Sequence, residues 1–146
     1  MSVTPYSDNR SKRDQVERMF DSISPKYDLL NRVFSLGVDQ GWRRKVIRQV
    51  ATEPVNDLLD VATGTADLAI LAAKVAHRVT GVDISEGMLA QGRVKVAQQG
   101  LQDRISLRQA DSTALPFADG CFDAVTVAFG VRNYEDLERG LREMLR

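Results

Sequence analysis

A run of small residues with an acid at each end occupies residues 60–67, Asp-Val-Ala-Thr-Gly-Thr-Ala-Asp, between an apolar run and a helical pattern. Small residues such as Gly64 and Thr65 let a ligand approach the main chain, and the free N–H groups at a helix start can donate to it. Asp60 supplies negative charge at the head of the run. The segment predicts a loop that binds a small charged molecule.

Two further acids end apolar runs downstream. Asp83 ends the second run, where its carboxylate can accept hydrogen bonds from the two vicinal hydroxyls of a ribose. Asp111 and Ser112 close the third run, where a carboxylate or a main-chain group can meet the amino group of an adenine. Three strand ends therefore predict one nucleoside-binding site.

The charge of the first loop discriminates between two nucleoside cofactors. A dinucleotide fingerprint, G-x-G-x-x-G, would place glycine at Ala62, Gly64 and Asp67, but only Gly64 fits. An acid beside a pyrophosphate would repel it. S-adenosylmethionine has no phosphate and carries an ammonium and a sulfonium, which carboxylates attract. The sequence predicts S-adenosylmethionine as the cofactor and no metal.

Alternating strand and helix patterns are expected to position these residues. Apolar runs at 57–65, 79–85, 105–112 and 122–130 predict four strands. Helical spacing over 67–75 and 87–98, with Ser85 as N-cap, separates them, which is typical of an α/β protein with a Rossmann-like, doubly wound parallel sheet. The link 115–122 gives no clear prediction of a helix.

The first fifty residues predict helices only. One helix is expected to end at Ser24-Pro25, a second to run from Tyr27, and a third to be capped by Asp39. We interpret residues 1–53 as an N-terminal helical segment that forms part of a substrate pocket or lid. Residues 54–146 form a partial Rossmann-like cofactor-binding part of the same single domain.

The last residues carry an apolar helical stripe that is still running at Arg146. A further strand would normally follow such a helix. We therefore expect an incomplete sheet and a C-terminally truncated chain.

Composition excludes several classes of protein. Twenty basic and twenty acidic residues cancel, which argues against a nucleic-acid partner. The single cysteine, Cys121, is expected to pack in the core of a protein from a reducing, cytoplasmic compartment. The single histidine, His77, is interpreted as an ordinary residue at a helix end. No apolar run approaches the length of a membrane span, so at most peripheral, transient contact with a membrane surface is expected.

Four longer segments resemble one family. They are FDSISPKYDLLNRVFSLGVDQGWRRK (20–45), LLDVATGTADLA (58–69), GVDISEGML (81–89) and QADSTALPFADGCFDAVTVAFGVRN (109–133). Over nearly its whole length the chain resembles the UbiE/MenG-type demethylmenaquinone C-methyltransferases of ubiquinone and menaquinone biosynthesis. The first and last segments are the more discriminating ones, because many methyltransferases share the other two.

The resemblance implies a class I S-adenosylmethionine-dependent methyltransferase fold and a role for each matching residue. Thr65 would lie against the cofactor, Asp83 would hold its ribose, and Asp111 with Ser112 would line the adenine pocket. Asp60 and Gly64 would shape the methionine end. Thr63 and Ala66 stand where family members commonly have glycine.

The implied reaction is methylation of a ring carbon of a prenylated quinol, from demethylmenaquinol to menaquinol or on the benzoquinol precursor of ubiquinol. Arg132 is expected to stabilise a developing phenolate or to orient a water that accepts the proton. Tyr27 is the second catalytic candidate beside Arg132 and would line the substrate pocket with Asn31 and Asn133. Tyr27 as a core residue, and Arg132 with Asn133 as a plain turn, remain alternatives. So do a methyltransferase for another small molecule and an inactive fragment that only binds cofactor.

Overall fold

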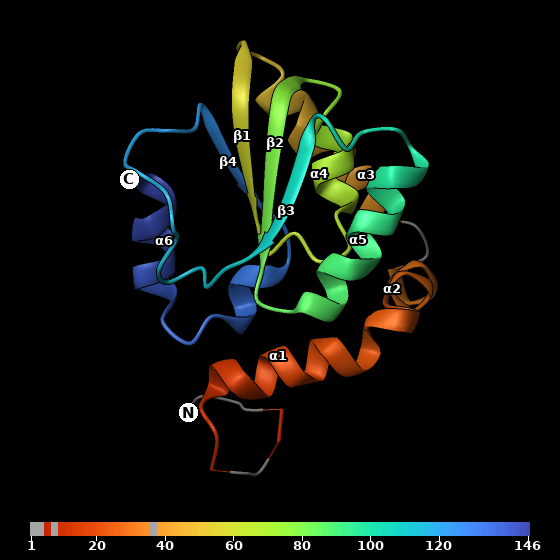
Figure 1. Ribbon diagram of the computed structural model, residues 1–146, viewed down its shortest axis with the longest axis vertical. Helices are drawn as coiled ribbons and strands as arrows, with labels where there is room; N and C mark the ends of the chain where they lie inside the picture. The colour runs from red at the N-terminus through yellow and green to blue at the C-terminus, as the bar shows by residue number, and fades with distance from the viewer. Residues whose placement is uncertain (1–4, 7–8, 36–37) are drawn as a thin grey trace.

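Three helices precede a four-stranded sheet in the computed structural model, which describes residues 5–6, 9–35 and 38–146 (Figure 1). The N-terminal elements are α1 (Lys12–Ile23), η1 (Ser24–Lys26), α2 (Tyr27–Ser35) and α3 (Val38–Val50). Ser11 caps α1 by accepting from the Asp14 N–H, and Pro25 lies in η1, where the chain turns between helices. The prediction of an all-helical start is confirmed over these residues.

Strands and helices alternate from residue 55 onward. The elements are β1 (Val55–Val61), α4 (Asp67–Ala72), β2 (Ala76–Asp83), α5 (Glu86–Gln98), β3 (Ile105–Gln109), β4 (Ala124–Val127), η2 (Gly130–Asn133) and α6 (Leu137–Leu145). The strand order is β3-β2-β1-β4 and every neighbouring pair is parallel. The order reverses at β1, which is the switch point where ligands of such sheets bind. All four strand predictions are confirmed.

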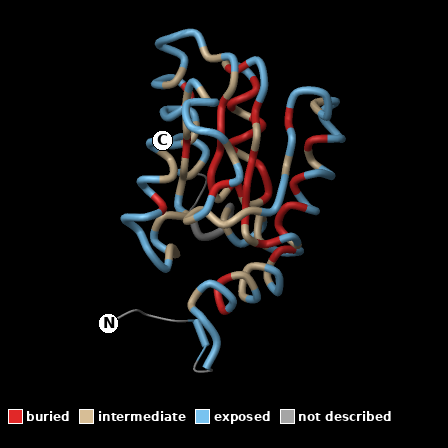
Figure 2. Tube along the Cα trace, turned by 60° about the vertical axis from the view of Figure 1, so that its left-hand side comes forward, coloured by how far each residue is buried: buried red, intermediate tan, exposed pale blue. Residues whose placement is uncertain are grey.

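Helices cover both faces of the sheet, as a doubly wound fold requires (Figures 1 and 2). The central strand divides its side chains between them, because successive residues of a strand point to opposite faces. Leu58 joins the core formed with α3, α4 and α5, whereas Leu59 joins the core under α6 and the connection before β4. Both side chains are almost fully buried. The core therefore fixes β1, and with it the loop that follows.

Helix α1 crosses the end of the sheet at which the strands finish (Figure 1). Asp21 attaches its last turn to α5 by accepting hydrogen bonds from the Ser85 hydroxyl at 2.5 Å and the Gly87 N–H at 3.0 Å. Ser85 also caps α5, as predicted, by accepting from the Met88 N–H. At the other end of α1, Lys12 donates to the Tyr134 carbonyl at 2.9 Å. Residues from α1 thus lie over the carboxyl ends of the strands.

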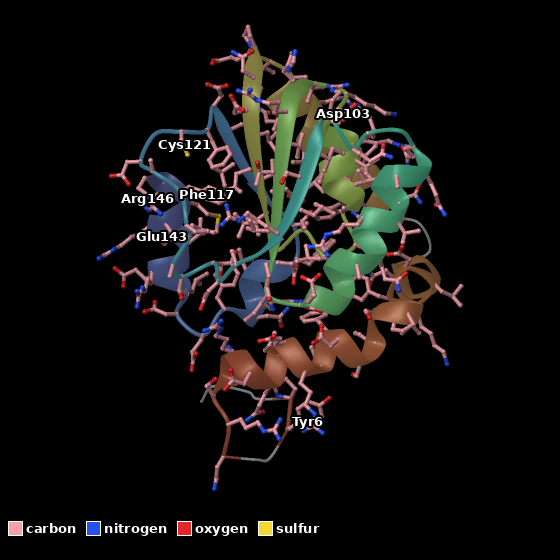
Figure 3. All side chains as sticks on the ribbon, viewed as in Figure 1. Tyr6, Asp103, Phe117, Cys121, Glu143 and Arg146 are labelled. Carbon is pink, nitrogen blue, oxygen red and sulfur yellow. The ribbon has the colours of Figure 1, made fainter. Side chains whose placement is uncertain are left out.

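The connection between β3 and β4 contains no helix and is fixed by the C-terminal helix. Arg146 donates to the carbonyls of Leu115 and Phe117, both at 2.6 Å, and Glu143 accepts from the Leu115 N–H at 2.7 Å. Figure 3 shows Phe117, Glu143 and Arg146 together on this side of the molecule. These bonds satisfy main-chain groups that lack secondary-structure partners.

Three local expectations were wrong. Cys121 is exposed on the rim of the molecule rather than packed in the core, because the turn before β4 carries it outward (Figure 3). His77 lies on β2, since α4 ends at Ala72 and the strand begins at residue 76. Asp39 lies in the first turn of α3 instead of capping it, since that helix begins at residue 38. Among the described residues, no helix combines the length and apolarity needed to cross a membrane.

Candidate active site

A cleft of about 1150 Å³, counted with its open mouth, lies at the carboxyl ends of the strands. Loops after β1, β2, β3 and β4 form its floor, and residues of α1, α2 and α3 form walls on the N-terminal side. Of the ten site residues expected from sequence, nine line it: Tyr27, Asp60, Gly64, Thr65, Asp83, Asp111, Ser112, Arg132 and Asn133. Asn31 lies on α2 and is not among the lining residues.

Asp60 is a buried carboxylate at the end of the central strand. Only 1% of the residue is exposed, and it accepts hydrogen bonds from the Thr63 hydroxyl at 2.7 Å and the Thr126 hydroxyl at 2.8 Å. Burial raises the pKa of Asp60 to about 6, although both hydroxyls oppose the shift. The cleft thus contains a costly negative charge with no cation bonded to it among the described residues, which suits a cationic ligand.

The loop after β1 adopts a strained backbone. Ala62, Gly64 and Ala66 all have positive φ, between 54° and 68°. For an alanine this left-handed conformation costs roughly 1–2 kcal/mol, and such strain is typical of ligand-binding loops. The conformation of Ala66 is therefore one that favours glycine. A Cβ on Gly130 would lie 2.2 Å from the Ala62 Cβ, so η2 passes directly against this loop.

Asp83 connects the second strand end to the loop. Its two carboxylate oxygens accept from the Gly64 N–H at 2.8 Å and the Ser85 N–H at 2.9 Å. Burial raises the pKa of Asp83, while these main-chain donors lower it. Each oxygen retains a lone pair for a ligand hydroxyl.

The third strand end brings three polar side chains to the cleft. Asp111 accepts from the Thr113 hydroxyl and N–H, and its second oxygen lies 3.3 Å from Arg13 Nε. Ser112 lines the cleft beside Tyr134, whose hydroxyl is buried without a hydrogen-bond partner of good geometry among the described residues. Burial raises the pKa of Tyr134 to about 12. An unsatisfied buried hydroxyl is unfavourable, so a ligand atom that bonds to it would gain affinity.

Aromatic and basic residues approach from the two ends of the chain. Tyr27 packs edge-on against Phe20, with ring centroids 6.1 Å apart, and both rings line the cleft. Arg132 is exposed on η2 and lies over the Phe129 ring at 6.0 Å. The cleft thus combines an acidic floor with an aromatic and cationic rim.

A network centred on Lys95 ties the N-terminal helices to the first loop. Lys95 on α5 donates to Asp28 at 2.7 Å, to the Thr65 hydroxyl at 2.9 Å and to Asp67 at 2.5 Å. The Thr65 hydroxyl donates in turn to Asp28 at 2.5 Å, and Arg43 on α3 pairs with Asp67 at 2.9 Å. We call these five residues the Lys95 network.

The Lys95 network has three consequences for the site. Burial acts to raise the pKa of Asp28, but hydrogen bonds from Lys95 and Thr65 outweigh it, so the pKa is lowered. The Thr65 hydroxyl is already engaged there, so any contact of Thr65 with a cofactor would use its other atoms. Since Asp28 follows Tyr27 directly, the network also holds that aromatic ring at the cleft.

Lys95→Met is expected to lower the free energy of unfolding by about 1–2 kcal/mol, a value discounted because Lys95 and Asp28 remain 23% and 39% exposed. Amide hydrogen exchange should accelerate in α2 and stay unchanged in β1 and β2. Chemical denaturation with exchange mass spectrometry measures both. Arg93→Met, which removes the exposed Arg93–Glu86 pair of the same helix, is the control. Equal effects of the two substitutions would contradict this role.

Several residues that line or support the site were missed from sequence. Thr126 and Thr63 stabilise Asp60 from two segments, and Tyr134, Arg43 and Lys95 surround the cleft or its loop. Thr126 carried a local signal as the polar residue of an otherwise apolar strand, and Thr63 lies in the predicted loop three residues from Asp60. The positions of Tyr134, Arg43 and Lys95 depend on tertiary contacts.

The sheet order β3-β2-β1-β4, with Asp60 and Asp83 at the ends of β1 and β2 on the floor of one cleft, corresponds to a partial class I methyltransferase fold. Solved structures agree. The (4+2)-cyclase SpnF has a TM-score of 0.81 and 25% sequence identity, over 99% of this chain and 58% of that one. A putative S-adenosylmethionine-dependent methyltransferase from Methanococcus maripaludis has a TM-score of 0.69 and 22% identity, over 97% and 62%.

The chain belongs to the ubiE/COQ5 methyltransferase family, whose model matches residues 8–146. It is 51% identical to a demethylmenaquinone methyltransferase of Bacteroides fragilis over 99% of this chain and 60% of that protein. It is 44% identical to the ubiquinone/menaquinone biosynthesis C-methyltransferase UbiE of Geotalea daltonii over 92% and 59%. The chain thus spans about 60% of the length of these curated relatives. Family membership confirms the resemblance found from sequence.

Proposed function

We propose that this chain provides the cofactor-binding part of an enzyme that transfers a methyl group from S-adenosylmethionine to a ring carbon of a prenylated quinol. The observation that carries the proposal is the cleft, in which buried Asp60 and Asp83 face the rim residues Tyr27 and Arg132. The names of the curated relatives support the quinol as the substrate class.

The residues present fit S-adenosylmethionine. Asp60 offers a charge to the ammonium group, Gly64 leaves room for close approach, and Asp83 offers two acceptors for the ribose hydroxyls. Ser112 and the unpartnered Tyr134 hydroxyl supply polar groups for the adenine end. Bound S-adenosylmethionine supplies an electrophilic methyl group on a sulfonium.

This chain's own residues would act on the quinol by position and charge. Residues 1–53 contribute Tyr27 and Phe20 as apolar walls that exclude water from the ring. The Arg132 guanidinium would stabilise the phenolate form of a ring hydroxyl, which makes the adjacent carbon nucleophilic. The proton of that carbon would leave to a water that Arg132 or Asn133 orients. A prenylated quinol resides in a bilayer, so the enzyme would work from the cytoplasm at the membrane surface.

Arg132→Ala is expected to lower turnover by about 100-fold, a typical loss for one electrostatic group at a developing oxyanion. The affinity for S-adenosylmethionine should change little, because Arg132 lies on the rim, away from Asp60 and Asp83. Steady-state methylation and calorimetric cofactor binding measure the two effects in the full-length enzyme. Arg139→Ala, an exposed arginine on α6, serves as the control. Unchanged turnover would remove Arg132 from the mechanism.

The substrate class is tested by offering demethylated naphthoquinols and benzoquinols beside simple phenols and carboxylic acids. Incorporation of labelled methyl into the quinols alone supports the proposal. Preference for a phenol or a carboxylate identifies a methyltransferase for another small molecule. This chain would be a binding-only fragment if it binds the cofactor but methylates none of these compounds, while a full-length relative methylates them in the same assay.

A further inference from the structure

Helix α3 presents an apolar stripe to solvent. Val38, Trp42 and Val46 are spaced four residues apart, which places them along one side of a helix. Their exposed fractions are 59%, 65% and 38%. The opposite side of the helix packs inward through Ile47, which is 8% exposed. Trp42 belongs to residues 20–45, one of the two segments that best distinguish the family by sequence. It does not line the cleft.

The adjoining helix extends this apolar surface. Leu29 and Leu30 on α2 are 65% and 38% exposed, and α2 packs against α3. We call Leu29, Leu30, Val38, Trp42 and Val46 the α2–α3 surface. Five exposed apolar side chains on two helices that pack together are of the kind that marks an interaction site.

Basic residues border the α2–α3 surface. Lys45 and Arg48 are exposed on α3 beside the stripe, whereas Arg44, two residues from both Trp42 and Val46, projects from the other flank of the helix. No salt bridge is found for these three residues within the described part of the chain. The one acid of α3, Asp39, is only 11% exposed and pairs with Arg43 at 3.0 Å. The next acid along the chain, Glu53, lies beyond the helix end. The outer side of α3 is therefore positive in a chain whose total charge is zero.

Apolar residues with a tryptophan, flanked by lysine and arginine, are the pattern of a helix that lies in the surface of a bilayer. Tryptophan favours the boundary between headgroups and acyl chains, and long basic side chains reach anionic headgroups. A globular partner or a second copy of this neutral chain would have no comparable need for uncompensated positive charge. Charge complementarity thus favours an anionic lipid surface.

The elements that form this surface also reach the cleft. Tyr27 begins α2 and Arg43 lies on α3, and both line the cleft. The Lys95 network holds the two helices against the first loop. A bilayer on the α2–α3 surface would therefore lie against the helices that form one wall of the site.

We propose that the α2–α3 surface docks on a membrane containing anionic phospholipid, with Trp42 inserted at the headgroup boundary and Lys45 and Arg48 on the headgroups. The inference rests on the proposed function in one respect only: docking would give a prenylated quinol access to the cleft. The docking itself needs neither cofactor nor quinol, so it is tested without them.

Trp42 is the only tryptophan of the chain, so the tryptophan fluorescence reports directly on the α2–α3 surface. The wild-type protein is titrated with vesicles of phosphatidylcholine alone and of phosphatidylcholine mixed with phosphatidylglycerol. Binding to the anionic vesicles should shift the tryptophan emission to shorter wavelength and expose it to quenching by brominated lipid. Added salt should weaken binding, because it screens exposed charges. Sedimentation of the vesicles measures the bound fraction independently.

Replacing Lys45 and Arg48 together by glutamine should weaken binding to anionic vesicles by about 25-fold, since each basic residue near such a surface contributes roughly fivefold. Lys74→Gln combined with Arg139→Gln changes the same number of exposed charges elsewhere and should leave most binding intact. Trp42→Ala should weaken binding while Val94→Ala, at an exposed apolar site on α5, should not. Thermal unfolding verifies that each variant is folded.

Three results would overturn the proposal. Binding without a change in Trp42 emission would place the contact on another surface. Equal loss in the two double variants would reduce the effect to total charge. A concentration-dependent dimer in light scattering, with Trp42 shielded from iodide before lipid is added, would make the surface an interface between copies. Loss of methylation with vesicle binding intact would instead count against the proposed function alone.

Discussion

Asp83→Asn is expected to weaken binding of S-adenosylmethionine by about 10- to 100-fold, because each hydrogen bond to a charged group contributes about 1.5–3 kcal/mol. The carboxylate is buried, and main-chain N–H groups of Gly64 and Ser85 already orient both of its oxygens. The substitution keeps the size of the side chain but removes the charge and one acceptor. Isothermal calorimetry on this chain measures the affinity.

Fragments of the cofactor separate this effect from general damage to the loop. Adenosine, which contains the ribose, should lose affinity in the Asp83→Asn variant, whereas methionine should not. Asp103→Asn, in the turn before β3, is a control with the same substitution at an exposed acid. A variant that remains folded and binds S-adenosylmethionine as tightly as the wild type would remove Asp83 from the cofactor site.

Asp60→Asn is expected to make the protein more stable and the cofactor complex weaker. Burial raises the pKa of Asp60 from 3.8 to about 6, and a shift of that size corresponds to roughly 3 kcal/mol against folding at pH values above it. Asparagine removes this penalty but keeps a single acceptor for the Thr63 and Thr126 hydroxyls, which offsets it by about 1 kcal/mol. A net gain of roughly 1–2 kcal/mol should remain above neutral pH.

The contribution of Asp60 to the free energy of unfolding depends on pH. Between pH 3.8 and about 6 the folded protein holds a proton on Asp60 that the unfolded chain has released. The contribution of Asp60 to stability therefore falls as pH rises through this window and stays low above it. The advantage of Asp60→Asn should accordingly grow as the pH rises from 3.8 to about 6 and stay constant above that value. Urea unfolding of both proteins across this range measures it.

Asp60→Asn should lower the affinity for the cofactor although it raises the stability of the protein. Loss of the Asp60 charge should weaken S-adenosylmethionine binding by about 10-fold or more, because charge-assisted bonds to the ammonium are lost. Wild-type affinity should also fall as pH drops below about 6, where Asp60 takes up a proton. Asp57→Asn, on the same strand but only half-buried and paired with Arg78, is the matched control and should do neither. An Asp60→Asn protein of unchanged stability and affinity would contradict both roles.

Local patterns determined most of the fold. Four short apolar runs became four parallel strands, and Ser85 capped α5 as expected, because strand burial and helix capping depend on nearby residues. The same patterns placed His77 and Cys121 wrongly. Both lie where one element gives way to the next, and such boundaries depend on how the neighbouring elements pack.

The acidic floor of the cleft was also readable from sequence. Asp60, Asp83 and Asp111 each end an apolar run, and the carboxyl ends of parallel strands meet at one edge of a sheet. Chain order alone therefore brought these carboxylates together. The resemblance to the family then named the cofactor class, and the structural comparisons agree with that fold.

Tertiary structure alone decided how these acids are held and what surrounds them. The Lys95–Asp28 pair joins residues 67 positions apart, and the bond of Thr126 to Asp60 spans 66 positions, so no local pattern records either. The pKa of Asp60 depends on burial under elements from both ends of the chain. Likewise, periodicity groups Val38, Trp42 and Val46 on one side of a helix, but only packing decides that this side faces solvent. Sequence fixes which residues share a face or a strand end, and the cooperative packing of distant segments fixes their environment.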